Sequence, residues 1–489
     1  MGRGGGGGKR LRLDSAGALR HVPARQRPSR EAAMETVIAA LRARLGERLS
    51  TARAVREHHS HGEGLPAVGL PDAVAFPNDN EEVAAILALC HEARVPVVPF
   101  GAGTSLEGHV AAVQGGISVS MVNMDRILSV SPEALDCRVQ AGVSRKRLNE
   151  ELRGHGLFFP VDPGADASLG GMAATRASGT AAVRYGTMRE AVLGLTVVMP
   201  DGRIVTTGGR ARKSAAGLDL TRLFVGSEGT LGLITEVQLR LHGLPEVVSA
   251  AVCQFPDTQA AIATVIAALQ IGLPLARVEY LNPSQMLVCI AYAKLNEYEP
   301  RPTLFLEFHG SAAAVAEQVE TMQALCAENG GSAFAFAERA EDRSRLWKAR
   351  HDAYHACLAA APGRKNMSTD ACVPISELAA CIAETEADIE ATGLLAPLVG
   401  HVGDGNFHLG IMFDPEDPDE TARADGLAMR VGERAIRFGG TCTGEHGIGL
   451  HKRGLLALEH GAGVAVMRAV KQALDPHGIM NPGKMLAPG

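Results

Sequence analysis

Three stretches rich in glycine and other small residues restrict how the first half of the chain can fold. The first, GAGTSLEG (residues 101–108), directly follows an apolar run, Val95, Val97 and Val98, which predicts a short buried strand. A strand that ends in a glycine-rich turn presents bare backbone N–H groups, and these can surround an anion such as phosphate. A plain turn between two strands is the alternative interpretation of this loop taken alone.

The loop matches neither of the common phosphate-binding motifs. Leu106 stands where the dinucleotide fingerprint needs its third glycine. His109 stands where a Walker A loop needs its lysine. A phosphate site at this loop would therefore be of another type.

The other two stretches extend the same pattern. Residues 160–186 are too small to fill a core and too apolar for a linker, which suits close approach of the backbone to an extended ligand. Two such segments, well separated along the chain, indicate a ligand as large as a dinucleotide. The third stretch, residues 226–235, is followed by alternating apolar residues, and we expect the first domain to end near residue 243.

From residue 244 onward the pattern changes. The sequence predicts strands and helices in the order β-α-β-β-α-β, which is typical of a ferredoxin-like sheet. The expected strands are 247–255, 276–281, 303–308 and 333–337, and the expected helices are 257–269 and 312–327. One long helix is expected over residues 338–360, and a last helix over residues 463–474.

Two short motifs in the second half carry groups that bind metals. In HVGDGNFH, His401 and His408 bracket a sequence that favours a tight reversal, so the two imidazoles can face each other across a turn. GEHGIG supplies Glu445 and His446. Two histidines and one carboxylate are a common ligand set for a catalytic divalent metal with an open position. The hypothesis is that His401, His408 and Glu445 bind the metal and that His446 moves a proton; hydrogen-bonded histidines in a glycine-rich loop are the alternative.

Composition excludes several classes of protein. A net charge of −6 over 489 residues, with one Trp and five Tyr, does not indicate a nucleic-acid surface. The nine cysteines have no regular spacing and predict buried free thiols in a reducing compartment. No apolar run is long enough for a transmembrane helix.

The first thirty residues are basic, rich in glycine and nearly free of acids, which predicts a disordered tail. A mitochondrial presequence shares the arginine content but seldom contains five consecutive glycines, so we expect a cytoplasmic protein, with peripheral attachment at an inner membrane as the alternative. The predicted domains are a tail (1–30), an N-terminal helical segment (31–65), a first domain (66–243) and a second domain (244–489).

Six motifs in order resemble the FAD-linked D-2-hydroxyacid dehydrogenases: PFGAGTSLEGH, DASLGGMAATRASG, VGSEGTLGLIT, HVGDGNFH, GTCTGEHGIG and LDPHGIMNPGKML. The resemblance runs from about residue 66 to the C-terminus, and it is most similar to the cytochrome-reducing type of D-lactate dehydrogenase. It implies the flavin fold of vanillyl-alcohol oxidase and p-cresol methylhydroxylase (PCMH). The predicted fold class is α+β: a PCMH-type FAD-binding domain, then a ferredoxin-like substrate or cap domain and a C-terminal helical segment that returns to the flavin.

The resemblance also implies the residues that contact FAD, which we expect to be bound non-covalently. Glu228, Gly229 and Ile234 are implied at the adenine side, and Asn481 near the flavin ring. The remaining implied contacts are Pro99, Gly101, Ala102, Gly103, Thr104, Ser105, Gly108, Asp162, Gly164, Ser168, Gly170, Gly171, Ala174, Ser178, Gly179, Tyr185 and Gly186.

The implied reaction is oxidation of a short D-2-hydroxy acid such as D-lactate to the 2-oxo acid. A divalent metal (Zn²⁺, or Mn²⁺ or Fe²⁺) would stabilise the alkoxide, His446 would take the proton, and hydride would pass to flavin N5. Arg350 and Lys365 match the basic residues that hold the substrate carboxylate. Gly410 stands where relatives that act on dicarboxylates can carry a polar residue, which favours a small substrate.

Other functions stay open at this point. The FAD subunit of a glycolate oxidase and a D-2-hydroxyglutarate dehydrogenase share the same metal motifs. A flavin-binding sensor or electron carrier without turnover is the non-enzymatic alternative. The expected partners are cytochrome c, a quinone or another electron acceptor, and a second copy of the chain in a homodimer.

Overall fold

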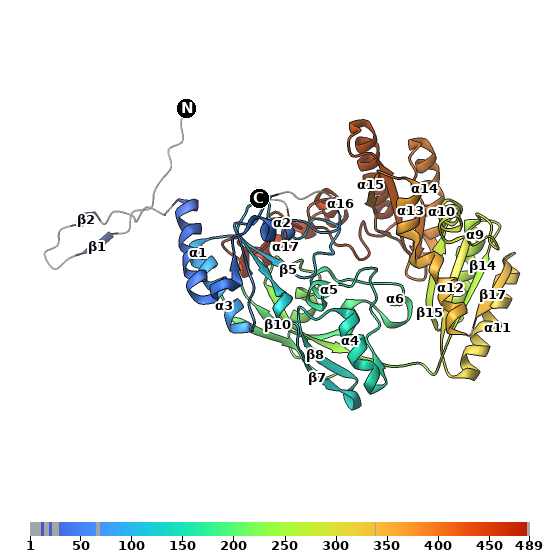
Figure 1. Ribbon diagram of the computed structural model, residues 1–489, viewed down its shortest axis with the longest axis horizontal. Helices are drawn as coiled ribbons and strands as arrows, with labels where there is room; N and C mark the ends of the chain where they lie inside the picture. Colours follow the sequence, from blue (N-terminus) through green and yellow to red (C-terminus); the bar gives the residue numbers. More distant parts are fainter. Residues whose placement is uncertain (1–10, 14–18, 22–28, 65–68, 338, 487–489) are drawn as a thin grey trace.

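The computed structural model describes residues 11–13, 19–21, 29–64, 69–337 and 339–486. The described residues from 29 onward form two lobes that lie side by side (Figure 1). We call residues 29–243 the first lobe, residues 244–441 the second lobe and residues 442–486 the C-terminal segment. The tail expected over residues 1–30 falls mostly outside the described residues. Its described parts are two strands that pair with each other, β1 (Leu11–Leu13) and β2 (Leu19–His21).

The first lobe begins with a four-stranded sheet covered by helices. The strand order is β3 (Leu49–Ser50), β4 (Ala73–Ala75), β6 (Ile117–Ser120) and β5 (Val97–Phe100). Apolar residues of α1 (Arg30–Leu45) and α3 (Asn80–Ala93) share one core with these strands. The Asp79 carboxylate accepts the N–H of Glu82, so α3 begins with a side-chain cap.

A second, antiparallel sheet completes the first lobe. Its strands, in spatial order, are β11 (Ile204–Gly208), β10 (Val192–Val198), β12 (Leu233–Arg240), β8 (Asp136–Gln140) and β7 (Ile127–Ser131). Strands β10 and β11 form a hairpin, with Val198 opposite Ile204. The short connecting elements are α2 (Arg53–His58), α4 (Arg145–Leu152), β9 (Leu157–Phe158), α5 (Leu169–Thr175), α6 (Ala182–Tyr185), α7 (Met188–Ala191), α8 (Leu220–Phe224) and β13 (His242–Gly243).

The second lobe is built on one large sheet with helices on both faces. Its strands, in spatial order, are β17 (Ser332–Ala337), β14 (Val247–Gln254), β16 (Thr303–Gly310), β15 (Leu275–Leu281), β20 (Leu398–His401), β21 (Asn406–Phe413) and β18 (Lys365–Ser368), with β19 (Ala371–Cys372) also paired to β21. The first four have the ferredoxin-like order that the sequence predicts. Strands β20, β21 and β18 extend this sheet.

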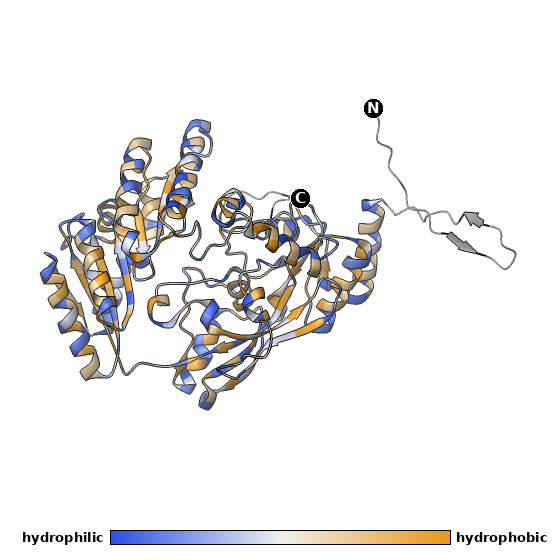
Figure 2. Cartoon of the chain, turned by 180° about the vertical axis from the view of Figure 1, so that it is seen from behind, coloured by the Kyte–Doolittle hydropathy of each residue, from blue (hydrophilic) through white to orange (hydrophobic). Residues whose placement is uncertain are grey.

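Two helical layers enclose the sheet of the second lobe. One core contains residues of α9 (Thr258–Gln270), α11 (Ala312–Glu328), α14 (Leu378–Thr392) and α15 (Pro418–Arg437). The other contains residues of α10 (Pro283–Ala293), α12 (Ala340–His351) and α13 (Ala353–Ala360). Hydrophobic residues face the sheet, and hydrophilic residues cover the outer faces of the helices (Figure 2). None of the described helices combines the length and hydrophobicity needed to cross a membrane.

Two expectations for the second lobe are corrected. The single helix expected over residues 338–360 is divided at Asp352 into α12 and α13. The helix α10 lies between the second and third ferredoxin-like strands, where none was expected; Asn282 caps it and Pro283 occupies its first turn.

The C-terminal segment leaves the second lobe and lies back on the first (Figure 1). It contains α16 (Arg453–His460) and α17 (Gly463–Leu474). Met480 forms a parallel bridge with Val97 of β5, and the N–H of Asn481 donates to the carbonyl of Val97 at 2.8 Å. The chain thus returns to the strand that leads into the first glycine-rich loop.

Candidate active site

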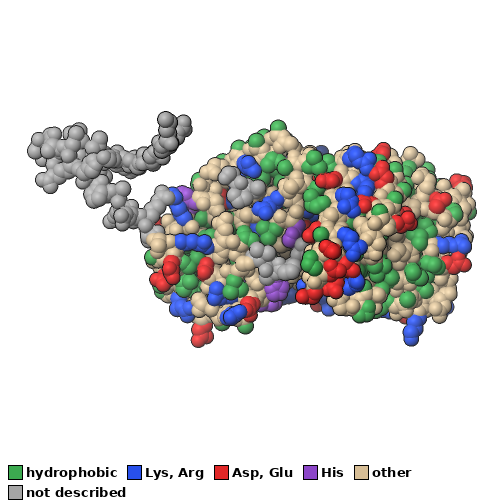
Figure 3. Space-filling model, turned by 90° about the horizontal axis from the view of Figure 1, so that it is seen from above, with side chains coloured by type: hydrophobic (Ala, Val, Ile, Leu, Met, Phe, Trp, Pro, Cys, Tyr) green, Lys and Arg blue, Asp and Glu red, His purple; other side chains and the backbone are tan. Residues whose placement is uncertain are grey.

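A cavity of about 1420 Å³ lies between the lobes. The glycine-rich loops line one side of it, and β18, β20, β21 and α13 line the other. Viewed from above, histidine and acidic side chains border the line where the lobes meet (Figure 3). The volume exceeds the roughly 300–1,000 Å³ of an ordinary small-ligand pocket, so there is room for a large cofactor together with a substrate.

The β20–β21 hairpin brings His401 and His408 together. Their ring centroids are 5.2 Å apart, and the turn between them contains Gly405 with φ +77°. The Nε2 atom of each histidine lies 3.3 Å from Oε1 of Glu445. The two imidazoles and one carboxylate that the sequence singled out therefore converge on one point.

The outer nitrogens of these histidines are held by other groups. Nδ1 of His401 lies 2.6 Å from Oε1 of Glu279, and Nδ1 of His408 lies 2.9 Å from the carbonyl oxygen of Thr369. Both partners accept a hydrogen bond from Nδ1, so each ring is held with Nε2 directed toward Glu445, which is the usual arrangement around a metal-binding histidine. Burial would raise the pKa of Glu445, but hydrogen bonds from His401 and His408 lower it below its ordinary value. The ligand atoms fit a divalent metal.

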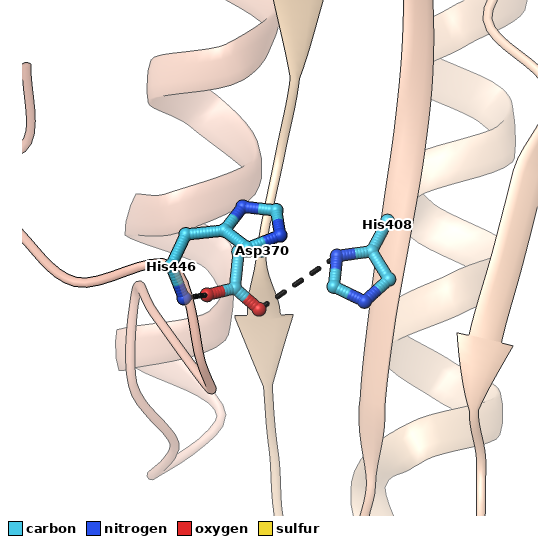
Figure 4. A group of neighbouring side chains, drawn as sticks. All are labelled: Asp370, His408 and His446. Atoms are coloured by element: carbon cyan, nitrogen blue, oxygen red, sulfur yellow. Dashed lines mark hydrogen bonds and ion pairs between the residues drawn. The ribbon is translucent and has the colours of Figure 1, made fainter. Parts of the chain in front are cut away.

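Asp370 holds the loop that carries Glu445 and His446 (Figure 4). One oxygen of this fully buried carboxylate accepts the backbone N–H groups of both residues, at 2.8 and 2.7 Å, and the hydroxyl of Thr443 at 2.7 Å. Its other oxygen accepts the amide of Asn406 at 2.9 Å. Asp370 was assigned no role from the sequence, because its partners are far away along the chain.

His446 lies beside the ligand set and stacks on one of its members. Its ring is 5.0 Å from that of His408, at an interplanar angle of 20°. Burial lowers the pKa of His446, although the Asp370 carboxylate acts in the opposite direction. Nδ1 is buried without a hydrogen-bond partner among the described residues, and the nearest carboxylate oxygen, Oε1 of Glu107, is 3.9 Å away. A neutral imidazole in this place can accept a proton.

The glycine-rich loops that line one side of the cavity, which we call the glycine-rich cradle, are shaped for close contact with a ligand. A methyl group added at Gly101 would lie 2.3 Å from Oγ of Ser168, and one at Gly170 would lie 2.4 Å from Cβ of Ala141. The hydroxyls of Ser105 and Ser168 are buried and have no hydrogen-bond partner within the described part of the chain. Unpaired buried hydroxyls beside bare backbone fit an anionic group such as a pyrophosphate.

Most of the residues implied to contact FAD do line the cavity. These are Pro99, Gly101, Ala102, Gly103, Thr104, Ser105, Asp162, Gly164, Ser168, Gly170, Gly171, Ala174, Gly179, Glu228, Gly229, Ile234 and Asn481. Gly108, Ser178, Tyr185 and Gly186 are not among the lining residues. The hydroxyl of Tyr185 instead lies 2.8 Å from Nδ1 of His309 in the second lobe.

Comparisons with known proteins agree with this geometry. The family model described as "FAD linked oxidases, C-terminal domain" matches residues 244–485, and "FAD binding domain" matches residues 71–208. "Probable D-lactate dehydrogenase, mitochondrial" of Danio rerio is 52% identical over 463 residues, which cover 94% of this chain and 93% of that relative. The chain belongs to the FAD-linked D-2-hydroxyacid dehydrogenase family.

Other relatives support the same family. "D-lactate dehydrogenase (cytochrome), mitochondrial" of Arabidopsis thaliana is 46% identical over 88% of this chain and 77% of its own. "Glycolate oxidase subunit GlcD" of Bacillus subtilis is 35% identical over 86% of this chain and 89% of its own. The prediction of an FAD-dependent enzyme related to the cytochrome-type D-lactate dehydrogenases is confirmed.

Solved structures confirm the predicted fold class. The 4-ethylphenol oxidase from Gulosibacter chungangensis superposes with a TM-score of 0.77 at 18% identity, over 93% of this chain and 97% of its own. p-Cresol methylhydroxylase superposes with a TM-score of 0.73 at 15% identity, over 94% of this chain and 98% of its own. At such low identity these likenesses concern the fold alone.

The relatives overturn the expected location. The relatives from Danio rerio and Arabidopsis thaliana are both named as mitochondrial proteins, so the preference for the cytoplasm over the mitochondrion was wrong. That preference gave the five consecutive glycines too much weight against the basic, acid-poor composition of the first thirty residues.

Of the two residues implied to hold the substrate carboxylate, the structure places one at the cavity and one outside it. Lys365 is exposed and does not line the cavity. The three residues that follow it on β18, Asn366, Met367 and Ser368, do line the cavity. Arg350 does line the cavity, and its Nε donates to Oε2 of Glu279 at 2.6 Å.

Glu228 contacts the loop that follows His446. Its carboxylate accepts the N–H groups of Ile448 and Gly449, at 2.7 and 2.9 Å, just after His446. Burial would raise the pKa of Glu228, but His109, whose Nε2 is 3.2 Å away, and these backbone groups lower it. Glu228 thereby ties the third glycine-rich stretch to the loop that carries the proposed base.

Proposed function

We propose that the protein oxidises D-lactate, or a similarly short D-2-hydroxy acid, to the 2-oxo acid. The observation that carries the proposal is the shared cavity: the His401–His408–Glu445 cluster and a neutral His446 face the same space as the glycine-rich cradle. The names of the relatives from Danio rerio and Arabidopsis thaliana favour D-lactate as the substrate. The word cytochrome in the second name favours a cytochrome as electron acceptor.

Each side chain has a distinct part in the proposed reaction. A divalent metal at His401, His408 and Glu445 would stabilise negative charge on the hydroxyl oxygen, and FAD would take up the hydride. His446 would accept the hydroxyl proton, because its ring is buried beside the ligand set and its Nδ1 has no hydrogen-bond partner among the described residues.

Arg350 would hold the substrate carboxylate. Its Nε is engaged by Glu279, so the two terminal nitrogens of its planar guanidinium can form the paired contact that a carboxylate favours. Lys365 has no part in this proposal, because its side chain lies outside the cavity. The substrate would then be held at one end by Arg350 and at its hydroxyl by the metal cluster.

Anaerobic titration of the purified protein tests the reaction. D-lactate should bleach the flavin absorbance, whereas L-lactate should not, because the carboxylate and hydroxyl contacts leave only one enantiomer with its transferred hydrogen toward the flavin. Glycolate and D-2-hydroxyglutarate serve as competing substrates. Faster bleaching by glycolate would favour a glycolate oxidase subunit, which the GlcD relative supports. Absence of bleaching by any of them would favour a flavin-binding sensor or carrier.

The metal is tested by its removal. Dialysis against a strong chelator should abolish flavin reduction by D-lactate while FAD stays bound, because different residues hold the two groups. Zn²⁺, Mn²⁺ and Fe²⁺ are then added back singly, with elemental analysis of the untreated protein as the reference. Undiminished reduction in protein shown to be metal-free would contradict the metal role.

A further inference from the structure

Glu279 is a buried carboxylate that connects the two halves of the proposed site. It lies on β15, and its side chain has no exposed surface. Oε1 is 2.6 Å from Nδ1 of His401, and Oε2 is 2.6 Å from Nε of Arg350. One side chain thus touches both a proposed metal ligand and the residue proposed to grip the substrate.

The sequence of β15 explains how a charge is held there. Val278 and Tyr280 point into the apolar core, while the alternate residues Arg277 and Glu279 point to the side of the cavity. Arg277 forms its own ion pairs with Asp162 and Glu307, at 3.0 and 2.9 Å. Glu279 is therefore left with His401 and Arg350 as its charged partners.

A carboxylate in this place is costly unless both of its oxygens are satisfied. Both are engaged, and neither belongs to the cluster that converges on Glu445. Glu279 lies behind His401, on the side away from that cluster, so it orients a ligand and is not one itself. It also fixes the guanidinium of Arg350 through Nε, which leaves the two terminal nitrogens for a carboxylate substrate.

We propose that Glu279 is a positioning residue that couples metal binding to binding of the substrate carboxylate. It holds the His401 ring with Nε2 directed toward the metal, and it holds Arg350 with its terminal nitrogens directed into the cavity. Any displacement of the Glu279 carboxylate moves both groups together. Because such coupling is reciprocal, a metal-loaded site and a well-placed Arg350 favour each other. This inference rests on the proposed function.

The test uses the FAD-loaded full chain and two measurements that need no turnover. The first is the affinity for Zn²⁺ or Mn²⁺, from metal content after equilibrium with a graded chelator. The second is the affinity of metal-free protein for oxalate, followed by the change in the flavin spectrum, which reports on the Arg350 side alone. The variants are Glu279→Gln, Glu279→Asp and Arg350→Gln. Glu386→Gln is the matched control: its carboxylate accepts the amide of Asn282 at 3.0 Å and does not line the cavity.

Glu279→Gln should lower the metal affinity about 10- to 100-fold, as loss of a partner behind a metal-binding histidine does. It should also weaken oxalate binding, because the neutral amide has a single accepting oxygen and cannot hold both Nδ1 of His401 and Nε of Arg350 as the carboxylate does. Arg350→Gln should weaken oxalate binding, and Glu386→Gln should change neither quantity. Glu279→Asp keeps the charge but has a shorter reach, so both losses should be smaller, which separates positioning from misfolding.

The proposal is overturned if Glu279→Gln loses only one of the two affinities or keeps both. A wild-type protein whose flavin is not reduced by any 2-hydroxy acid would refute the proposed function instead. The metal and oxalate measurements would still decide the role of Glu279 in that case.

Discussion

At the scale of single residues, the buried carboxylates of the site and the proposed base, His446, differ in their hydrogen bonding. Glu279, Asp370 and Glu445 each accept hydrogen bonds from histidine, arginine or backbone N–H groups. His446 lies among them with its Nδ1 unpaired by any described residue. Burial favours the neutral form of its ring, which is the form that a proton acceptor requires.

Replacing His446 tests this assignment. His446→Gln keeps much of the volume of the side chain but cannot accept a proton, so we expect flavin reduction by D-lactate to slow by about 10²- to 10⁴-fold. Stopped-flow absorbance measures the rate. Metal content and FAD absorbance should stay at wild-type values, since the ring is not one of the proposed ligands. A rate within threefold of wild type would remove His446 from proton transfer.

Lys484 provides a prediction about stability. Its side chain is buried, with 2% of the residue exposed, and its ammonium donates to the carbonyl of Ala111. Burial, together with the nearby Arg453, lowers the pKa of Lys484 to about 7. The unfolded chain has a lysine pKa of about 10.4, so between these values the unfolded state binds more protons and stability rises with pH.

Lys484→Met removes the free-energy penalty of burying a protonated amine. The variant should melt at a higher temperature than the wild type below pH 7, where the penalty is fully present. The difference should shrink as the pH rises toward about 10, where the lysine is neutral in both states. Melting curves of both proteins with FAD, recorded across this range, provide the comparison. A difference that does not depend on pH would show that the amine is not buried as a charge.

At the scale of secondary-structure elements, contact between α5 and β8 shapes the glycine-rich cradle. Gly170 on α5 approaches Ala141, the residue just after β8, so closely that an added Cβ would lie 2.4 Å from the Cβ of Ala141 and 3.0 Å from its backbone. Backbone atoms cannot move aside as a flexible side chain can. The helix would have to shift away from the sheet, and the cavity wall with it.

Gly170→Ala should therefore weaken FAD retention and lower the melting temperature, at a cost of about 1–3 kcal/mol for overpacking. FAD release is measured by fluorescence of the filtrate after dilution. Gly154→Ala is the matched control, because a Cβ there would meet nothing within 4 Å. If the two alanine variants release FAD equally, the close approach has no role in cofactor binding.

At the scale of the whole molecule, a chain of polar contacts joins the two lobes. Arg277 of the second lobe binds Asp162 of the first at 3.0 Å and also binds Glu307. Glu307 accepts from His309 at 2.8 Å, and His309 meets the hydroxyl of Tyr185 in the first lobe. The first and last contacts of this series both involve residues 160–186, so the packing of the two lobes and the shape of the glycine-rich cradle are connected.

Arg277→Met breaks this connection and leaves two carboxylates without their cation. Removing one member of a buried pair costs about 3–5 kcal/mol, so we expect a lower melting temperature and faster proteolytic cleavage between the lobes. Flavin reduction should slow because the two sides of the cavity no longer align. Arg301→Met, which removes an exposed pair with Glu299, is the control and should change little. Equal stability of both variants would contradict a joining role for Arg277.

Local signals made much of the second lobe predictable. The alternation along residues 247–337 predicts its first strands and helices, and the turn in HVGDGNFH places His401 and His408 on adjacent strands. The prediction of one long helix was wrong because its periodicity continues through Asp352, where α12 nevertheless ends and α13 begins. Periodicity records which face is apolar, but it does not record where packing divides a helix.

The sequence by itself determined the family, the fold class and the residue types available for chemistry, because motifs and hydrophobic spacing are local properties. Only the tertiary structure decided that Lys365 faces away from the cavity and that Glu228 meets the loop after His446. It also showed that Asp370 holds that loop and that Glu279 holds His401. Strand register and contacts between distant segments set these positions, and no stretch of sequence contains both partners of such a contact.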